Sequence, residues 1–114
     1  MPKDDRLRLK HMLEAAKEAI TAAQGRTRDD LEKDRIWTLG IVKCAEIIGE
    51  AAARIDPKSR ARHPDIPWAE IIAMRNRLVH VYFEVDLDQV WQAVTVDMPL
   101  LVKEIERALA REGA

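Results

Sequence analysis

Apolar residues recur every three to four positions along most of this chain, which is the spacing of amphipathic helices. The first such stretch runs roughly from Asp4 to Gln24, and Gly25 is a natural stop for it. The second runs roughly from Asp30 to Arg54. It ends before Asp56-Pro57, because the residue before a proline is steered away from helical angles. The pattern predicts two long helices in the first half of the chain.

The second half of the chain has more interruptions. A connection of about a dozen residues, which contains three prolines, follows the second helix. A third helix is predicted from about Pro67 to His80, and the β-branched and aromatic run Val81–Val85 is predicted to be extended. A fourth helix begins at Asp86, which has capping-box spacing, and Pro99 inside it should kink it because proline lacks a backbone N–H. The chain is therefore predicted to be all-α, with four helices.

Composition narrows the class of protein. The 114 residues suit one domain, residues 1–114, and 47% hydrophobic with 34% charged residues is a globular balance. A net charge of −1 argues against a general basic field for nucleic acid. The single cysteine, Cys44, excludes an internal disulfide. No apolar run approaches the roughly 20 residues that cross a bilayer, and the N-terminus lacks a signal-peptide core, so we expect a cytoplasmic protein away from membranes.

Positive charge is concentrated in one segment. The stretch 54–64 contains four basic residues and one acid, Asp56; the basic residues are Arg54, Lys58, Arg60 and Arg62. Such a loop can rim a nucleic-acid groove, or it can simply be solvated. The sequence leaves both readings open.

The run Arg75-Asn76-Arg77-Leu78-Val79-His80-Val81-Tyr82 carries the candidate chemistry. On a helical wheel Arg75 falls inside the apolar arc of the third helix, whereas Arg77 falls on the opposite, solvent-facing side. Arginine cannot lose its charge, so Arg75 needs an anionic partner. That partner is either a carboxylate of the fold, for which Glu46 and Glu50 on the second helix are the candidates, or a phosphate from outside.

His80 is the candidate acid or base. Five residues separate it from Arg75, so the two share no face of a regular helix, whereas Asn76 and His80 do. Arg75 and His80 can converge only if the backbone leaves the helix near His80. Histidine can exchange protons near neutral pH, and arginine can hold a phosphate oxygen. Together they suffice for metal-free RNA cleavage, in which the 2′-hydroxyl of the substrate is the nucleophile.

Plainer roles stay open for these side chains. A histidine at a helix end can be a cap or a satisfied surface group, and Tyr82 can serve packing alone. The strong metal ligands His11, His63, His80 and Cys44 lack zinc-ligand spacing. No phosphate-cradling glycine loop is present. We therefore expect neither a metal nor a cofactor.

The run from Arg75 to Tyr82 resembles the R-x-x-x-x-H-x-Y motif of HEPN-domain ribonuclease toxins of the HepT type. The resemblance continues on both sides of the motif. Glu46–Ala52 is similar to the second-helix signature of the family, and Ile66–His80 is similar to its central block. Tyr82–Leu87 and Asp97–Pro99 are similar to its closing block. The similarity follows the family order over nearly the whole chain.

This resemblance implies a HEPN-type four-helix bundle that forms a homodimer, with two motifs facing one cleft. It implies that Arg75, Asn76 and His80 cleave RNA, and that the protein is the toxin of a HEPN/MNT toxin–antitoxin system. Its partner would be an MNT-type nucleotidyltransferase antitoxin that transfers AMP from ATP to Tyr82. The chain departs from the family at Val81, where relatives often have glycine, and a β-branched residue resists unusual backbone angles.

Two alternatives to a ribonuclease remain from the sequence. One is a helical partner and substrate of the nucleotidyltransferase without nuclease activity of its own. The other is a plain structural dimer, which gives no reason for an arginine on an apolar arc.

Overall fold

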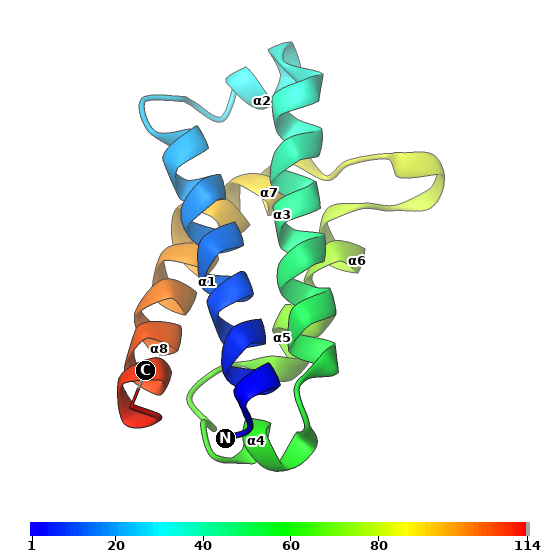
Figure 1. The fold of residues 1–114 in the computed structure, drawn as a ribbon. Helices are drawn as coiled ribbons and strands as arrows, with labels where there is room; N and C mark the ends of the chain where they lie inside the picture. Colours follow the sequence, from blue (N-terminus) through cyan, green and yellow to red (C-terminus); the bar gives the residue numbers. More distant parts are fainter. Residues whose placement is uncertain (114) are drawn as a thin grey trace.

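The computed structural model describes residues 1–113, apart from the side chain of Phe83. The described chain is built from helices and the turns between them, so the predicted all-α class is confirmed. Three long helices dominate it, namely α1 (Lys3–Ala23), α3 (Arg35–Arg54) and α8 (Met98–Arg111). Helix α1 packs between α3 and α8, and the shorter helices α5, α6 and α7 also contact α3 (Figure 1).

The core lies where these helices meet. The two middle turns of α1 bury Leu9 and Met12 completely, and the facing turns of α3 bury Ile41 and Ile48. Helix α8 contributes Ile105 to the same cluster. Burial of such side chains is worth about 1.5–3 kcal/mol each, so this contact holds the long helices together. None of the helices within residues 1–113 has the length and the apolar character needed to cross a membrane.

The second predicted helix is broken near its start, which corrects the expectation of one helix from Asp30 to Arg54. A short helix α2 (Asp30–Lys33) precedes α3, and Asp34 between them has φ −123° and ψ 83°. The Asp34 carboxylate accepts a hydrogen bond from the backbone N–H of Trp37 at 3.1 Å and pairs with Arg26 at 3.0 Å. Asp34 thus caps α3, and a cap lies outside the helix that it starts.

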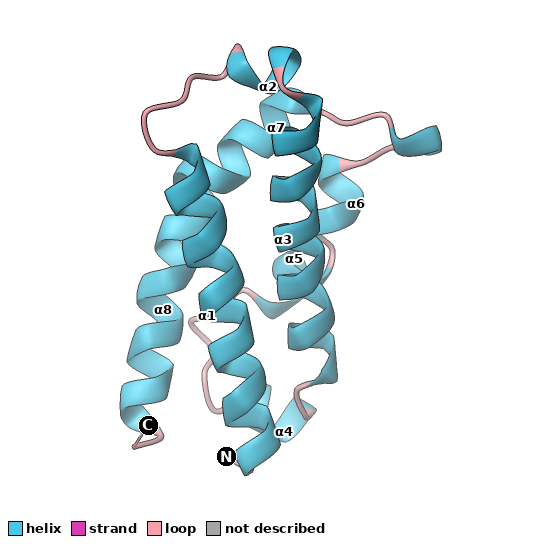
Figure 2. Ribbon diagram, turned by 45° about the horizontal axis from the view of Figure 1, so that its top comes forward, coloured by secondary structure: helices cyan, strands magenta, loops and turns pink. Residues whose placement is uncertain are grey.

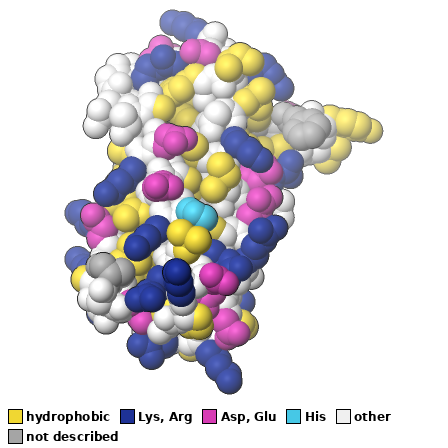
Figure 3. All heavy atoms as spheres, in the orientation of Figure 1, with side chains coloured by type: hydrophobic (Ala, Val, Ile, Leu, Met, Phe, Trp, Pro, Cys, Tyr) yellow, Lys and Arg dark blue, Asp and Glu magenta, His cyan; other side chains and the backbone are white. Residues whose placement is uncertain are grey.

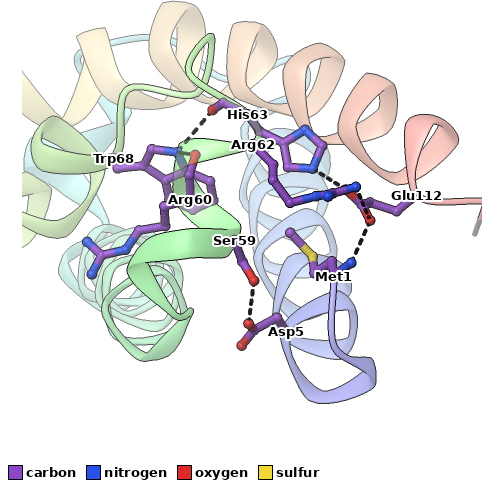
Figure 4. A network of polar contacts seen from close by, with 8 residues as sticks. All are labelled: Met1, Asp5, Ser59, Arg60, Arg62, His63, Trp68 and Glu112. Atoms are coloured by element: carbon purple, nitrogen blue, oxygen red, sulfur yellow. Dashed lines mark hydrogen bonds and ion pairs between the residues drawn. The ribbon is translucent and has the colours of Figure 1, made fainter.

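The connection after α3 contains a helix that the sequence reading missed, α4 (Pro57–Ala61). Asp56 caps it by accepting a hydrogen bond from the N–H of Lys58 at 2.8 Å, and Pro57 stands at its first turn, where a missing N–H costs nothing. The buried hydroxyl of Ser59 donates to Asp5 of α1 at 2.7 Å (Figure 4). These bonds dock the connection on the N-terminal end of α1.

Glu112 gathers positive groups from three parts of the chain (Figure 4). Its carboxylate oxygens lie 2.9 Å from the amino group of Met1, 3.0 Å from Nε of Arg62 and 2.8 Å from Nε2 of the buried His63. The Met1 ammonium, then Arg62, then His63 lower the pKa of Glu112 to about 2. Arg60 of the same basic stretch donates to the carbonyl of Ile55 at 3.1 Å. Two of the four basic residues of this stretch therefore hold the fold together.

The third predicted helix is two short ones, α5 (Trp68–Ile72) and α6 (Met74–Leu78), with a bend at Ala73. They lie very close to α3 at Gly49. A Cβ atom at position 49 would come within 3.1 Å of the carbonyl oxygen of Ile71. Glycine at this crossing lets the backbone of Ile71 and Ile72, just before the motif, lie directly on α3.

The last predicted helix starts at the predicted place, because Asp86 accepts a hydrogen bond from the N–H of Gln89 at 3.2 Å and caps α7 (Leu87–Gln92). A π-helical turn, η2 (Ala93–Asp97), joins α7 to α8. Pro99 stands in the first turn of α8 and has no N–H to offer the carbonyl four residues before it. The irregularity expected from Pro99 thus takes the form of a π turn immediately before it.

Candidate functional site

Arg75 and Asn76 lie in an open hollow between α3 and α6, with a volume of about 380 Å³. We call it the α3–α6 hollow; its lining residues are Glu46, Gly49, Glu50, Ala53, Ile72, Arg75 and Asn76. Gly49, where the backbone of Ile71 and Ile72 lies closely on α3, and Ile72 itself both line this hollow. The structure thus places two of the three predicted ribonuclease residues side by side.

Arg75 is half-buried, as its place in the apolar arc predicts. Glu46 and Glu50 lie in the same hollow, but within the described chain neither forms an ion pair with Arg75. Glu46 is held by Lys43 at 3.3 Å instead. The guanidinium of Arg75 therefore borders on carboxylates and remains available to another anion.

Arg77 is not the solvent-facing residue that the wheel predicts. Its Nη2 lies 2.5 Å from Oδ2 of Asp97, and its Nε atom is buried. The wheel fails here because it treats the helix as isolated, whereas the π turn η2 brings Asp97 against α6. Arg77 is a structural residue that ties α6 to the start of α8.

His80 and Tyr82 lie beyond α6, on a segment that we call the motif loop, residues 79–86. Helix α6 ends at Leu78, earlier than predicted, and Val79 is extended and paired with Val85 in an antiparallel bridge. Backbone hydrogen bonds from His80 to Glu84 at 2.7 Å and from Asp86 to Leu78 at 2.8 Å close the loop. The motif loop projects from the body of the molecule (Figures 1 and 2).

Tyr82 sits at the far end of the motif loop with its side chain 95% exposed. Val81 beside it is 72% exposed, and the space-filling view shows apolar side chains at this projecting end (Figure 3). The backbone at Tyr82 has φ 57° and ψ 35°, and no other non-glycine residue within 1–113 has a positive φ. The predicted extended run Val81–Val85 is wrong, because residues 81–83 form a tight 3₁₀ turn.

The left-handed backbone conformation costs tyrosine about 1–2 kcal/mol relative to the right-handed one. The β-branched Val81 was expected to resist unusual backbone angles, and the positive φ falls on the neighbouring Tyr82 instead. The strained residue is thus the one whose hydroxyl is most accessible. Strain of this kind is held by surrounding structure, here the bonds that close the motif loop.

His80 contacts a carboxylate that the sequence reading named only as a helix cap. Its Nε2 lies 3.5 Å from Oδ2 of Asp86, and about half of its side chain is exposed. The bond from the N–H of Gln89, and then the contact with His80, lower the pKa of the Asp86 carboxyl. The bridge between Val79 and Val85 brings the two side chains together, and the predicted extended run contains no such turn.

One chain therefore holds the predicted site in two parts. Arg75 and Asn76 lie in the α3–α6 hollow, whereas His80 and Tyr82 lie on the motif loop and do not line that hollow. Among the described residues no group of three histidine, cysteine, aspartate or glutamate side chains is arranged to hold a metal ion. Cys44 is buried, and burial raises the pKa of its thiol.

Comparison with known proteins finds one family. The sequence model of the family described as "Ribonuclease HepT-like" matches residues 12–108. The chain is 36% identical over 102 residues to a Thermococcus cleftensis protein named "Probable ribonuclease HepT". The aligned residues cover 86% of this chain and 93% of the relative.

Two further relatives have names that propose an RNase. One, from Caldanaerobacter subterraneus subsp. tengcongensis, is 34% identical over 104 residues, or 91% of this chain and 93% of the relative. The other, from Methanocaldococcus jannaschii, is 32% identical over 95 residues, or 83% and 87% of the two chains. No solved structure matches the chain.

Proposed function

Because the chain belongs to the HepT-like ribonuclease family, we propose that it is a metal-independent endoribonuclease in which Arg75, Asn76 and His80 act on RNA. The observation that carries this proposal is the half-buried guanidinium of Arg75 in an open hollow, without a carboxylate paired to it in the described chain. A cation in that position suits a phosphate of the substrate.

The reaction is a transesterification within the RNA. His80 accepts the proton of the 2′-hydroxyl, and the 2′-oxygen attacks the adjacent phosphorus. The bond from phosphorus to the 5′-oxygen breaks, and that oxygen takes a proton from solvent water as it leaves. Arg75 binds a non-bridging phosphate oxygen as its charge develops, and Asn76 donates a hydrogen bond to the same group. The products are a 2′,3′-cyclic phosphate and a 5′-hydroxyl.

A homodimer of HEPN-type bundles completes the site in this proposal. Two observations support it: the motif is divided between a hollow and a projecting loop, and Val81 and Tyr82 at the end of that loop are 72% and 95% exposed. A second copy packed beside the loop would bring two arginines and two histidines to one cleft. Light scattering should give twice the mass of the chain, and a monomer at micromolar concentration would contradict the dimer.

We further propose that Tyr82 controls the enzyme as an AMP acceptor. Its exposed hydroxyl would attack the α-phosphorus of ATP held by a nucleotidyltransferase antitoxin, and pyrophosphate would leave. The protein is then the toxin of a HEPN/MNT pair. A phosphodiester on Tyr82 adds bulk and negative charge beside His80, where the phosphate of the RNA must bind.

A second candidate function is a non-nuclease substrate of that nucleotidyltransferase. The observation that favours it is the same exposed, strained Tyr82 at the end of the motif loop, which needs no cleft to be modified. It predicts AMP transfer without RNA cleavage.

Expression of the protein without a partner tests the toxin assignment. We expect growth to slow, and His80→Ala to abolish the effect. His11→Ala is the matched control, because His11 is an exposed histidine on α1, away from the motif loop. A folded His80→Ala protein that stays fully toxic would defeat the nuclease assignment.

Intact mass after co-expression with the nucleotidyltransferase tests the control by AMP. Additions of AMP units should be present in the wild type and absent in Tyr82→Phe, which should keep its RNase activity. Additions that persist in Tyr82→Phe would place the site elsewhere. Their absence from the wild type would favour simple blocking of the cleft by the partner.

A further inference from the structure

Asp86 links the motif histidine to the helix that follows the loop. One carboxylate oxygen, Oδ1, accepts the N–H of Gln89 at 3.2 Å, and the other, Oδ2, lies 3.5 Å from Nε2 of His80. The backbone N–H of Asp86 donates to the carbonyl of Leu78 at 2.8 Å. Asp86 is therefore fixed by its backbone and by one oxygen, and its second oxygen is aimed at the imidazole.

An ionised carboxylate can only accept hydrogen bonds. The two bonds that lower the pKa of Asp86 keep it ionised, so the ring nitrogen that faces it must carry the proton. In a neutral histidine one ring nitrogen is a donor and the other an acceptor. A proton on Nε2 thus leaves the lone pair on Nδ1.

We propose that Asp86 is a positioning residue for His80, because its carboxylate fixes the Nε2–H tautomer and leaves Nδ1 to accept the proton of the 2′-hydroxyl. The tautomer is a property of this chain alone, whereas the transfer of the proton rests on the proposed function. Asp86 contacts no substrate in this account. It acts through His80, in the way that the third residue of a catalytic triad orients the general base.

One substitution, Asp86→Asn, removes the carboxylate and keeps the helix cap. Asparagine caps helices as well as aspartate does, so in Asp86→Asn the side-chain oxygen remains on the N–H of Gln89. The amide nitrogen then faces His80, and it donates. A donor at that position requires a lone pair on Nε2, so the substitution should move the proton to Nδ1. Asp86→Asn is expected to invert the tautomer without unfolding the loop.

The control variant is Asp88→Asn, which removes a carboxylate two residues further along α7. Asp88 pairs with Arg28 at 2.8 Å and does not contact His80. It removes the same charge as Asp86→Asn at a position two residues away in the chain. We expect it to leave both the tautomer and the RNA cleavage of the wild type unchanged.

The experiment is a nitrogen-15 NMR measurement of the His80 ring in the three proteins, at about pH 8, where the neutral form of an ordinary histidine dominates. The wild type and Asp88→Asn should show a protonated Nε2, and Asp86→Asn a protonated Nδ1. Thermal unfolding should coincide in the wild type and Asp86→Asn. The kcat for RNA cleavage by Asp86→Asn should fall by at least about tenfold, and by no more than the 10²–10⁴ that a general acid or base contributes, with KM nearly unchanged.

Any of three results would overturn the proposal. The first is a wild-type ring protonated on Nδ1, and the second is a tautomer that is the same in wild type and Asp86→Asn. The third is an inverted tautomer with an unchanged kcat. If the wild type cleaves no RNA, the proposed ribonuclease function fails, and the NMR comparison still decides whether Asp86 sets the tautomer.

Discussion

Arg77 is paired with Asp97, across the contact between α6 and the π turn before α8. Arg75, two residues earlier on the same short helix, faces the α3–α6 hollow on α3 and forms no ion pair within the described chain. The two arginines have the same chemistry, but within residues 1–113 only Arg77 forms an ion pair. Arg77 thus has a structural role and Arg75 a role in the proposed reaction, so the same substitution at each can be compared directly.

We expect Arg75→Ala to abolish RNA cleavage with little change in the free energy of unfolding, because it leaves no paired carboxylate behind. Arg77→Ala strands Asp97 at a partly buried contact, and should lower the free energy of unfolding by about 1–2 kcal/mol. Urea unfolding of both variants, followed by a cleavage assay, checks this. Equal destabilisation by the two substitutions would show that Arg75 also has a partner in the fold.

The crossing of α5 over α3 gives a second matched pair. Gly49→Ala places a methyl group 3.1 Å from the carbonyl oxygen of Ile71, and overpacking costs about 1–3 kcal/mol. At Gly40 on the same helix an added methyl group meets open space. Gly40→Ala should therefore raise the free energy of unfolding by about 0.5–1 kcal/mol, because alanine is more stable than glycine in a helix. Thermal unfolding should therefore shift in opposite directions. A stabilised Gly49→Ala protein would show that α5 and α6 are not held tightly on α3.

Glu112 should make stability depend on pH in the acid range. Its folded pKa of about 2 lies below the ordinary value of 4.5, so the unfolded chain binds the proton more tightly. The stabilisation is complete above about pH 5 and is lost as the pH falls toward 2, and amounts to at most about 3 kcal/mol. The unfolding free energy of Glu112→Gln should be lower at neutral pH and should vary less between pH 5 and 2. Parallel pH profiles for the two proteins would contradict the role of this cluster.

The helices and their ends could be predicted from the sequence where nearby residues determine them. Gly25 after α1 and Asp86 before α7 are such signals, and both are in place. The breaks at Asp34 and Ala73 could not be found this way, because the apolar spacing continues across them. Asp34 leaves the helix to cap it and to pair with Arg26, which is a contact outside the local run.

The candidate site was predictable as a set of residues and not as a geometry. The R-x-x-x-x-H-x-Y pattern names Arg75, His80 and Tyr82, and it contains no information on where the helix ends. The turn at Tyr82 depends on the pairing of Val79 with Val85, and the fate of Arg77 depends on Asp97, which is 20 residues away. Contacts of this kind arise from tertiary packing, which a helical wheel cannot represent.

The most direct measurement is cleavage of a defined RNA by the purified protein in the presence of EDTA, with analysis of the new ends. We expect cleavage to persist with 2′,3′-cyclic phosphate and 5′-hydroxyl ends, to be absent from the same strand with 2′-deoxyribose, and to fall at least about 100-fold in His80→Ala. His11→Ala, purified in the same way, should match the wild type. Cleavage by His80→Ala at the wild-type rate, or ends other than these, would contradict the account.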